Sequence, residues 1–215
     1  MPFPRANAEM EMKRVSAFTL IELLVVITII AVLMGIAFPV FQSIQNSAKK
    51  TQAKNDVTQI VTAVNAYYTE YGKYPVTGAA DVIDGPGGTT TTDGLFSTLR
   101  GLDLATNARQ ITFISPADVK DKANPRSGIA TDDATVNRVS VKKGEFVDPW
   151  GSPYAIEMDA DYTSQIETNP YGANNGAGAS PLRQGVIAWS LGKDTKLGNN
   201  GNSIFTGSDD VISWQ

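Results

Sequence analysis

The 215-residue chain contains no cysteine and no histidine. Without cysteine, no disulfide can hold the domain together. Without histidine, the chain lacks the usual general base near neutral pH and the commonest metal ligand. Zinc sites and cysteine–histidine chemistry are therefore excluded, although a metal held by oxygen ligands is not. Because no other catalytic constellation is visible, we do not expect an enzyme.

The chain has no excess of basic residues over acidic ones. The chain has 18 Lys and Arg against 22 Asp and Glu, a formal charge of −4 and a pI near 4.9. Such a balance argues against nucleic acid as a partner. The length suits one membrane segment followed by one domain of ordinary size.

Charge is also nearly missing from a long apolar run. From Phe18 to Phe41 the only charged residue is Glu22. At about 1.5 Å per helical residue, this run is long enough to cross a hydrocarbon core of about 30 Å. An ionisable residue inside such a run is energetically costly, so Glu22 is a candidate functional residue.

The start of the chain differs from an ordinary secretory signal. Such a signal has an apolar core of about 7–15 residues followed by a cleavage site at small residues. Here the run is longer, and the expected cut lies before it, between Ala17 and Phe18. The apolar segment therefore stays in the product as an anchor. Arg5, Lys13 and Arg14 before the run favour a cytoplasmic N-terminus, whereas lysines after it weaken that signal.

Residues 13–75 resemble the N-terminus of type IV pilins and type II secretion pseudopilins. The similarity rests on a basic pair, the sequence Phe-Thr-Leu-Ile-Glu at positions 18–22, and Pro39 at a common helix-kinking position. Ala17 stands where the family usually has glycine. The resemblance implies cleavage by a prepilin peptidase at Ala17/Phe18, N-methylation, and a single-pass protein of the bacterial inner membrane. Its N-terminus would be cytoplasmic and its C-terminal domain periplasmic.

The spacing of apolar residues predicts one helix from Phe18 to about Tyr71, ended by Gly72 and Pro75. We therefore divide the chain into four segments: a leader (1–17), a transmembrane and polymerisation helix (18–41), an amphipathic helix (42–75) and a periplasmic globular domain (76–215). Within that domain we expect a loop at 76–94, a short helix at 95–104 capped by Asp93, and a mobile loop at 168–181. Strands are expected at 137–141, 154–158 and 185–190. The fold class is α+β, with a long N-terminal helix packed on a small antiparallel sheet and a C-terminal loop.

Two further stretches are similar to the major pseudopilin of type II secretion. One is Asp148–Tyr154, and the other combines residues 190–194 with residues 208–214. The resemblance implies that the second region forms a calcium-binding loop. The chain is longer than a typical major pseudopilin, chiefly in residues 76–135 and 160–184.

Three acids in that region are candidate calcium ligands: Asp194, Asp209 and Asp210. A glycine-rich segment from Gly192 to Gly207 allows the chain to fold back and bring them together. Calcium takes six to eight oxygens, so the Leu191 carbonyl and Ser208 are expected to assist. This is not an EF-hand, because Lys196 occupies a position that needs an oxygen donor. The alternative is that all three are solvated loop acids.

Glu22 and Pro39 are the residues expected to act in assembly. Glu22 either reaches out to water near a membrane face or pairs with the α-amine that cleavage exposes on Phe18 of a neighbouring subunit. Opposite charges attract strongly in a low dielectric, and either one left unpaired there is costly. The family resemblance implies the pairing role.

The sequence thus predicts a structural subunit of a type II secretion pseudopilus that supports protein export. Expected partners are copies of itself, minor pseudopilins, the prepilin peptidase, the inner-membrane secretion assembly platform and the membrane. The alternative is the pilin of a type IV pilus for adhesion or DNA uptake.

Overall fold

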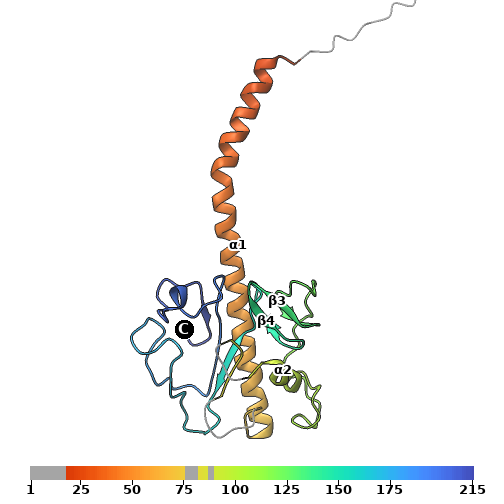
Figure 1. Cartoon of the computed structure of the whole chain (residues 1–215), viewed down its shortest axis with the longest axis vertical. Coiled ribbons are helices and arrows are strands. Elements are labelled where there is room, and N and C mark those ends of the chain that lie inside the picture. Colours follow the sequence, from red (N-terminus) through yellow and green to blue (C-terminus); the bar gives the residue numbers. More distant parts are fainter. Residues whose placement is uncertain (1–17, 76–81, 87–89) are drawn as a thin grey trace, which may run out of the picture. The chain divides into compact units, whose positions relative to one another are not determined.

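The computed structural model describes residues 18–75, 82–86 and 90–215 (Figure 1). The predicted leader, including Ala17, and residues 76–81 and 87–89 of the predicted loop lie outside the described residues. The chain divides into two compact units, residues 1–45 and 46–215.

A single helix, α1 (Leu20–Tyr71), confirms the predicted long helix. Thr19 and Glu22 close its first turn: the Thr19 hydroxyl accepts the Glu22 N–H at 3.3 Å, and the Glu22 carboxylate accepts the Thr19 N–H at 2.9 Å. At the other end Gly72 has φ +68° and donates its N–H to the Tyr68 carbonyl at 2.8 Å. Glycine adopts this left-handed conformation without steric cost and so ends the helix. The helix continues through Pro39.

The first part of α1 is apolar around its whole circumference. Leu20, Leu33 and Phe38 are 83%, 60% and 67% exposed, and their neighbours are similar. By length and composition this part can cross a membrane. The Thr28 hydroxyl donates to the Leu24 carbonyl at 2.7 Å, so this polar group is satisfied within the helix.

The later part of α1, from residue 46, buries one stripe against a four-stranded antiparallel sheet. The sheet has the order β1 (Val82–Asp84), β6 (Ala155–Met158), β7 (Val186–Ser190), β8 (Val211–Ile212). The buried stripe consists of Ala53, Val57, Ile60, Ala63, Val64 and Tyr67. These residues recur at the three- and four-residue spacing of one helix face. A buried hydrogen bond of 2.7 Å from the Tyr154 hydroxyl to Asp56 joins the helix to the start of β6.

The central strands β6 and β7 are buried on both faces. Residues of β6 and β7 alternate between two hydrophobic clusters, as the pleat of a strand requires. Ile156, Met158 and Ala188 face the cluster that contains α1. Ala155, Ile187 and Trp189 face a second cluster, whose other fully buried members include Ile166, Tyr171 and Ala177. The predicted mobile loop at 168–181 is therefore a packed segment, because Tyr171 and Ala177 fill this second cluster.

Two small two-stranded antiparallel sheets lie beside the four-stranded one, and one of them is a hairpin. Strand β2 (Gly128–Ile129) pairs with β5 (Phe146–Val147), and β3 (Ala134–Val136) pairs with β4 (Val139–Val141). The strand predicted at 137–141 begins two residues later. Asn137 and Arg138 have φ +50° and +69°, which form the two-residue turn between β3 and β4.

The predicted helix at 95–104 is shorter and begins earlier, as α2 (Asp93–Leu99). Asp93 lies in its first turn and is not its cap. Gly101, with φ +75°, ends the helix through bonds from the N–H groups of Gly101 and Leu102 to the carbonyls of Thr98 and Ser97. Leu102, which falls within the predicted helix, lies beyond the end of α2 and is 62% exposed. A short 3-10 helix, η1 (Asn199–Gly201), lies in the C-terminal loop.

Candidate functional site

The N-terminal motif forms a reciprocal cap at the start of α1. The Glu22 carboxylate accepts two bonds on Oε2, from the Thr19 N–H at 2.9 Å and from the Thr19 hydroxyl at 2.7 Å. This is a capping box, in which the cap residue and the third helical residue satisfy each other's N–H groups. The partners expected for Glu22 were water and a neighbouring amine, and Thr19 of the same chain was not among them. The Thr-x-x-Glu spacing was the available signal.

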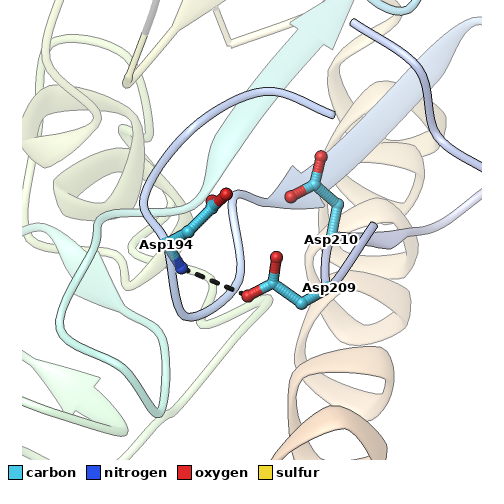
Figure 2. Close-up of side chains that lie close together, drawn as sticks. All are labelled: Asp194, Asp209 and Asp210. Atoms are coloured by element: carbon cyan, nitrogen blue, oxygen red, sulfur yellow. Dashed lines mark hydrogen bonds between the residues drawn. The ribbon is translucent and has the colours of Figure 1, made fainter. Parts of the chain in front are cut away.

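The second site gathers the three predicted acids at one end of the sheet. Asp194 follows β7, while Asp209 and Asp210 directly precede β8. Because Ser190 of β7 pairs with Val211 of β8 in antiparallel register, these positions meet. One carboxylate oxygen from each acid lies within 4.8 Å of the others. Figure 2 shows Asp194 on one limb of the loop, facing Asp209 and Asp210 on the other.

Gly192 allows the two limbs to approach this closely. It has φ +64°, and a Cβ there would lie 2.6 Å from the Asp209 carbonyl oxygen. Immediately after it, the N–H groups of Lys193 and Asp194 both donate to Asp209 Oδ2, the second at 3.2 Å. The Asp209 carboxylate is thereby fixed beside Asp194.

Asp210 is the most buried of the three acids, with only 5% of its surface exposed. Its Oδ2 accepts the Tyr171 hydroxyl at 2.8 Å and the Gly198 N–H at 2.6 Å. Its Oδ1 has no hydrogen-bond partner among the described residues. Burial raises the pKa of Asp210 to about 6, although both hydrogen bonds oppose that rise. A buried, unpartnered carboxylate oxygen beside two further carboxylates is an environment that a cation would stabilise.

The two assisting residues lie on the same loop. Leu191 follows β7 and is 7% exposed. The Ser208 hydroxyl accepts the Asp210 N–H at 3.3 Å, and its carbonyl accepts the Lys50 ammonium at 3.3 Å. Their role as oxygen ligands stays a prediction, whereas Asp194, Asp209 and Asp210 form a group that can hold a metal ion.

The Asp148–Tyr154 stretch is connected to this loop. Asp148 is fully buried, and its Oδ1 accepts the N–H groups of residues 150–152 at 2.8–3.0 Å. The Ser190 hydroxyl donates to its Oδ2 at 2.5 Å and accepts the Gly192 N–H at 3.1 Å. The two stretches singled out in the sequence are therefore parts of one hydrogen-bonded structure.

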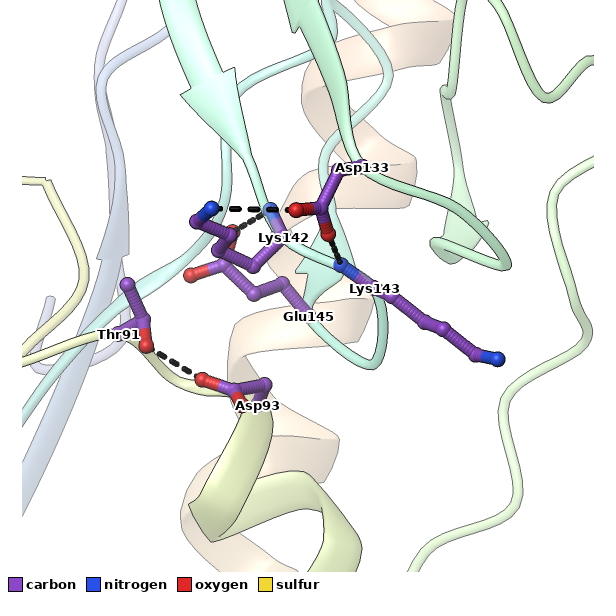
Figure 3. Close-up of polar contacts among 6 residues, drawn as sticks. All are labelled: Thr91, Asp93, Asp133, Lys142, Lys143 and Glu145. Carbon is purple, nitrogen blue, oxygen red and sulfur yellow. Dashed lines mark hydrogen bonds and ion pairs between the residues drawn. The ribbon is translucent and has the colours of Figure 1, made fainter.

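A separate polar group surrounds Glu145 (Figure 3). Its carboxylate accepts the Thr92 N–H at 3.2 Å and the Lys142 N–H at 2.7 Å. Asp133 accepts the Lys142 ammonium at 3.1 Å and the Lys143 N–H at 2.9 Å. These contacts join the turn after β4 to the start of α2 and to the β3 hairpin, so we assign this group a structural role.

Comparison with known proteins supports one family. The family described as "Prokaryotic N-terminal methylation motif" matches residues 12–38. The type II secretion system core protein G of Pseudomonas aeruginosa is 27% identical over 145 residues, which is 67% of this chain and 75% of that protein. Core protein G of Aeromonas hydrophila is 24% identical over 147 residues, which is 68% of this chain and 76% of that protein. The type IV major pilin protein PilA of Myxococcus xanthus is 39% identical over 57 residues, or 26% of each chain. No solved structure matches.

These similarities agree with the geometry at both ends of α1. The matched motif covers the cap at Thr19 and Glu22 and most of the apolar run, and the helix packs from residue 46 onward on a small antiparallel sheet. Pilins and pseudopilins are structural proteins and not enzymes, as expected for this chain. The chain is a type IV pilin-like protein that carries the N-terminal methylation motif.

Proposed function

We propose that the chain is a structural subunit of a type II secretion pseudopilus. The observation that carries this proposal is the extent of its similarity to core protein G, which runs over 145 residues and so extends beyond α1 into the globular domain. The similarity to the Myxococcus xanthus pilin covers only 57 residues. By its name, core protein G is a component of a type II secretion system, and we propose that this chain belongs to such a system as well.

In this proposal the prepilin peptidase cuts between Ala17 and Phe18, and Phe18 becomes the methylated N-terminus. Before assembly the subunit is a single-pass protein of the bacterial inner membrane, with its N-terminus in the cytoplasm and its globular domain in the periplasm. Its partners are other copies, minor pseudopilins and the inner-membrane assembly platform. The exposed apolar side chains of α1 support an anchor of this kind.

Glu22 sets the register of assembly. Outside the bilayer, the apolar surface of α1 is stable only where like helices cover it. Both bonds from Thr19 end on Glu22 Oε2, which leaves Oε1 to accept a bond from the α-amine of a neighbour's Phe18. A misplaced subunit would leave both charges unpaired in a low dielectric, at considerable cost. Pro39 is proposed to adjust the helix for packing in the filament.

We further propose that the acid cluster binds calcium. Asp194, Asp209 and Asp210 supply carboxylate oxygens, and the Leu191 carbonyl and Ser208 supply further oxygens. Calcium accepts irregular cages of six to eight oxygens, whereas magnesium requires near-octahedral geometry. In a chain without cysteine, such an ion would clamp the C-terminal loop in place of a disulfide.

Thermal unfolding of the full chain in detergent tests the calcium site. Calcium should raise the midpoint, and at a hundredfold excess over the dissociation constant it should stabilise the protein by about 2.7 kcal/mol. Magnesium should have a much smaller effect. Asp194→Ala should abolish the shift. Asp121→Ala is the matched control, and Asp121 lies on a different loop. Asp121 accepts the Ala123 N–H at 2.9 Å, just as Asp194 accepts the Lys196 N–H at 2.9 Å. Identical midpoints in calcium and chelator would show that the three acids do not bind calcium.

Gene deletion tests the secretion function. In a host whose secretion cluster encodes a secretin and a secretion ATPase, loss of this gene should leave exported proteins in the periplasm. Normal export combined with loss of surface pili and of adhesion or DNA uptake would favour the alternative, a type IV pilin. The 40% identity to the fimbrial protein EcpC of Eikenella corrodens favours that alternative, but it covers only 63 residues.

A further inference from the structure

We infer that Tyr171 is a positioning residue for the metal site and that this is one purpose of the insertion at residues 160–184. The inference rests on the proposed metal site. In this view, the Tyr171 hydroxyl holds one oxygen of Asp210, so that the other oxygen stays directed to the space shared with Asp194 and Asp209.

The contacts of Asp210 divide between its two oxygens. Tyr171 and the Gly198 N–H both donate to Oδ2, at 2.8 and 2.6 Å. Oδ1 has no partner among the described residues and belongs to an acid that is 5% exposed. Two donors on one oxygen fix the rotation of the carboxylate plane. Groups that orient a metal ligand in this way contribute strongly to metal affinity.

Tyr171 is itself held rigidly. It is fully buried, its ring meets Phe205 edge-on with centroids 5.4 Å apart, and the Trp214 ring lies 6.1 Å away. Its N–H donates to the Asn169 side-chain oxygen at 3.0 Å, and its carbonyl accepts the Asn175 amide at 2.5 Å. The hydroxyl therefore has little freedom to move away from Asp210.

The backbone of the same segment is also hydrogen-bonded to the loop that carries the metal site (residues 191–210, the metal loop) and to Trp214 after it. The Asn175 carbonyl accepts the Phe205 N–H at 2.8 Å, and the Ala177 carbonyl accepts the Trp214 indole N–H at 2.7 Å. Gly176 has φ +90°, and a Cβ there would lie 2.0 Å from the Thr206 hydroxyl oxygen. Residues 169–177 thus form hydrogen bonds with residues that precede Asp209 and Asp210 in the sequence and with residues that follow them.

The alternative is that Tyr171 is only a core residue of the second cluster. Tyr154 provides a matched comparison, because it is also fully buried and donates its hydroxyl to a carboxylate, Asp56, at 2.7 Å in the other cluster. A purely structural hydroxyl at either position would change stability alone. A positioning hydroxyl at Tyr171 would also change calcium affinity.

The test measures calcium dissociation constants by calorimetry on the full chain in detergent. Tyr171→Phe keeps the ring and removes the hydroxyl, and it should weaken calcium binding by about 10- to 100-fold. Tyr154→Phe should bind calcium as the wild type does, even where both variants melt earlier in chelator. Asn175→Ala, which releases the Tyr171 carbonyl and keeps every buried ring, should weaken binding in the same direction by a smaller factor.

Each outcome decides between the two proposals. Wild-type affinity in both Tyr171→Phe and Asn175→Ala would overturn the positioning role and leave the metal site intact. Weakening of equal size in Tyr154→Phe would also overturn it, because the effect would then follow general stability. A wild-type chain that binds no calcium would overturn the metal site and this inference together.

Discussion

At Gly192 the two limbs of the metal loop lie close together. A side chain there would meet the Asp209 backbone at 2.6 Å and its carboxylate at 2.7 Å, with φ fixed at +64°. Backbone atoms cannot move aside as the end of a flexible side chain can. The close approach of Asp194 and Asp209 therefore depends on the absence of a Cβ at one position.

Gly192→Ala should abolish the calcium-dependent rise in melting temperature. The substitution combines left-handed strain of about 1–2 kcal/mol with a clash that separates the acids. Gly207→Ala is the control, because Gly207 has φ +81° with nothing within 4 Å of its Cβ position. It carries the strain without the clash, so its calcium response should persist. Loss of the response in both variants would show that strain alone is responsible.

Asp148 should make stability depend on pH. Burial raises its pKa from 3.8 to about 6, against the opposing effect of Ser190 and three backbone N–H groups. A group whose pKa is higher in the folded state stabilises the protein below its unfolded pKa, and this contribution is lost as pH rises through the folded value. At about 1.4 kcal/mol per pKa unit, it amounts to at most ~3 kcal/mol.

The comparison with Asp148→Asn isolates this contribution. Asparagine keeps an oxygen for the N–H groups of residues 150–152 but does not titrate. In chelator, the stability of the wild type relative to the variant should fall between about pH 4 and pH 6 and stay level above pH 6. Thermal midpoints across that range give the measurement. A constant difference would mean that Asp148 has the same pKa in both states.

The acids of the metal loop could be predicted from sequence, whereas Tyr171 could not. Asp194, Asp209 and Asp210 flank a glycine-rich segment, and that local pattern predicts a fold-back. Tyr171 reaches Asp210 across 39 residues of sequence. Such a contact depends on how the insertion packs on the sheet, and no local spacing encodes it.

At the scale of elements, α1 was predictable because its signals are local. A run of apolar residues, a helical stripe and a terminal glycine together fix its extent within two residues. The strands have only two to five residues each. That is too short for alternation to stand out, and strands such as β1 and β8 are defined by the partner with which they pair. Tertiary packing therefore decides them.

Glu22→Ala should leave membrane insertion intact and impair polymerisation. Removing a charge from an apolar helix favours insertion, but a neighbour's amine would lose its partner. Thr19→Val separates this role from capping, because it removes the hydroxyl of the cap and keeps the carboxylate. Capping alone is worth about 0.5–2 kcal/mol. Cross-linking of filaments should show a larger defect for Glu22→Ala. Equal defects in the two variants would assign Glu22 to capping alone.

For the molecule as a whole, maturation should remove residues 1–17. Mass spectrometry of the assembled protein should find a chain that begins at Phe18 and carries a methyl group. Ala17→Gly should be cut at least as completely, because it restores the residue usual in the family. Ala17→Leu should block cutting, since a bulky residue hinders entry of the backbone into the peptidase site. An assembled chain that retains Met1–Ala17 would contradict the proposed processing.

Because hydrophobic clusters pack on both faces of β6 and β7, only some positions of this protein can carry an attached probe. Ala177 belongs to the second cluster and has no exposed surface, so a fluorophore or an epitope tag placed there would force open the packing around Trp189. Ala123 lies on an exposed loop between Asp121 and Asn124. Because the chain has no cysteine of its own, a single cysteine at Ala123 would give one uniquely labelled position for following filament growth by microscopy.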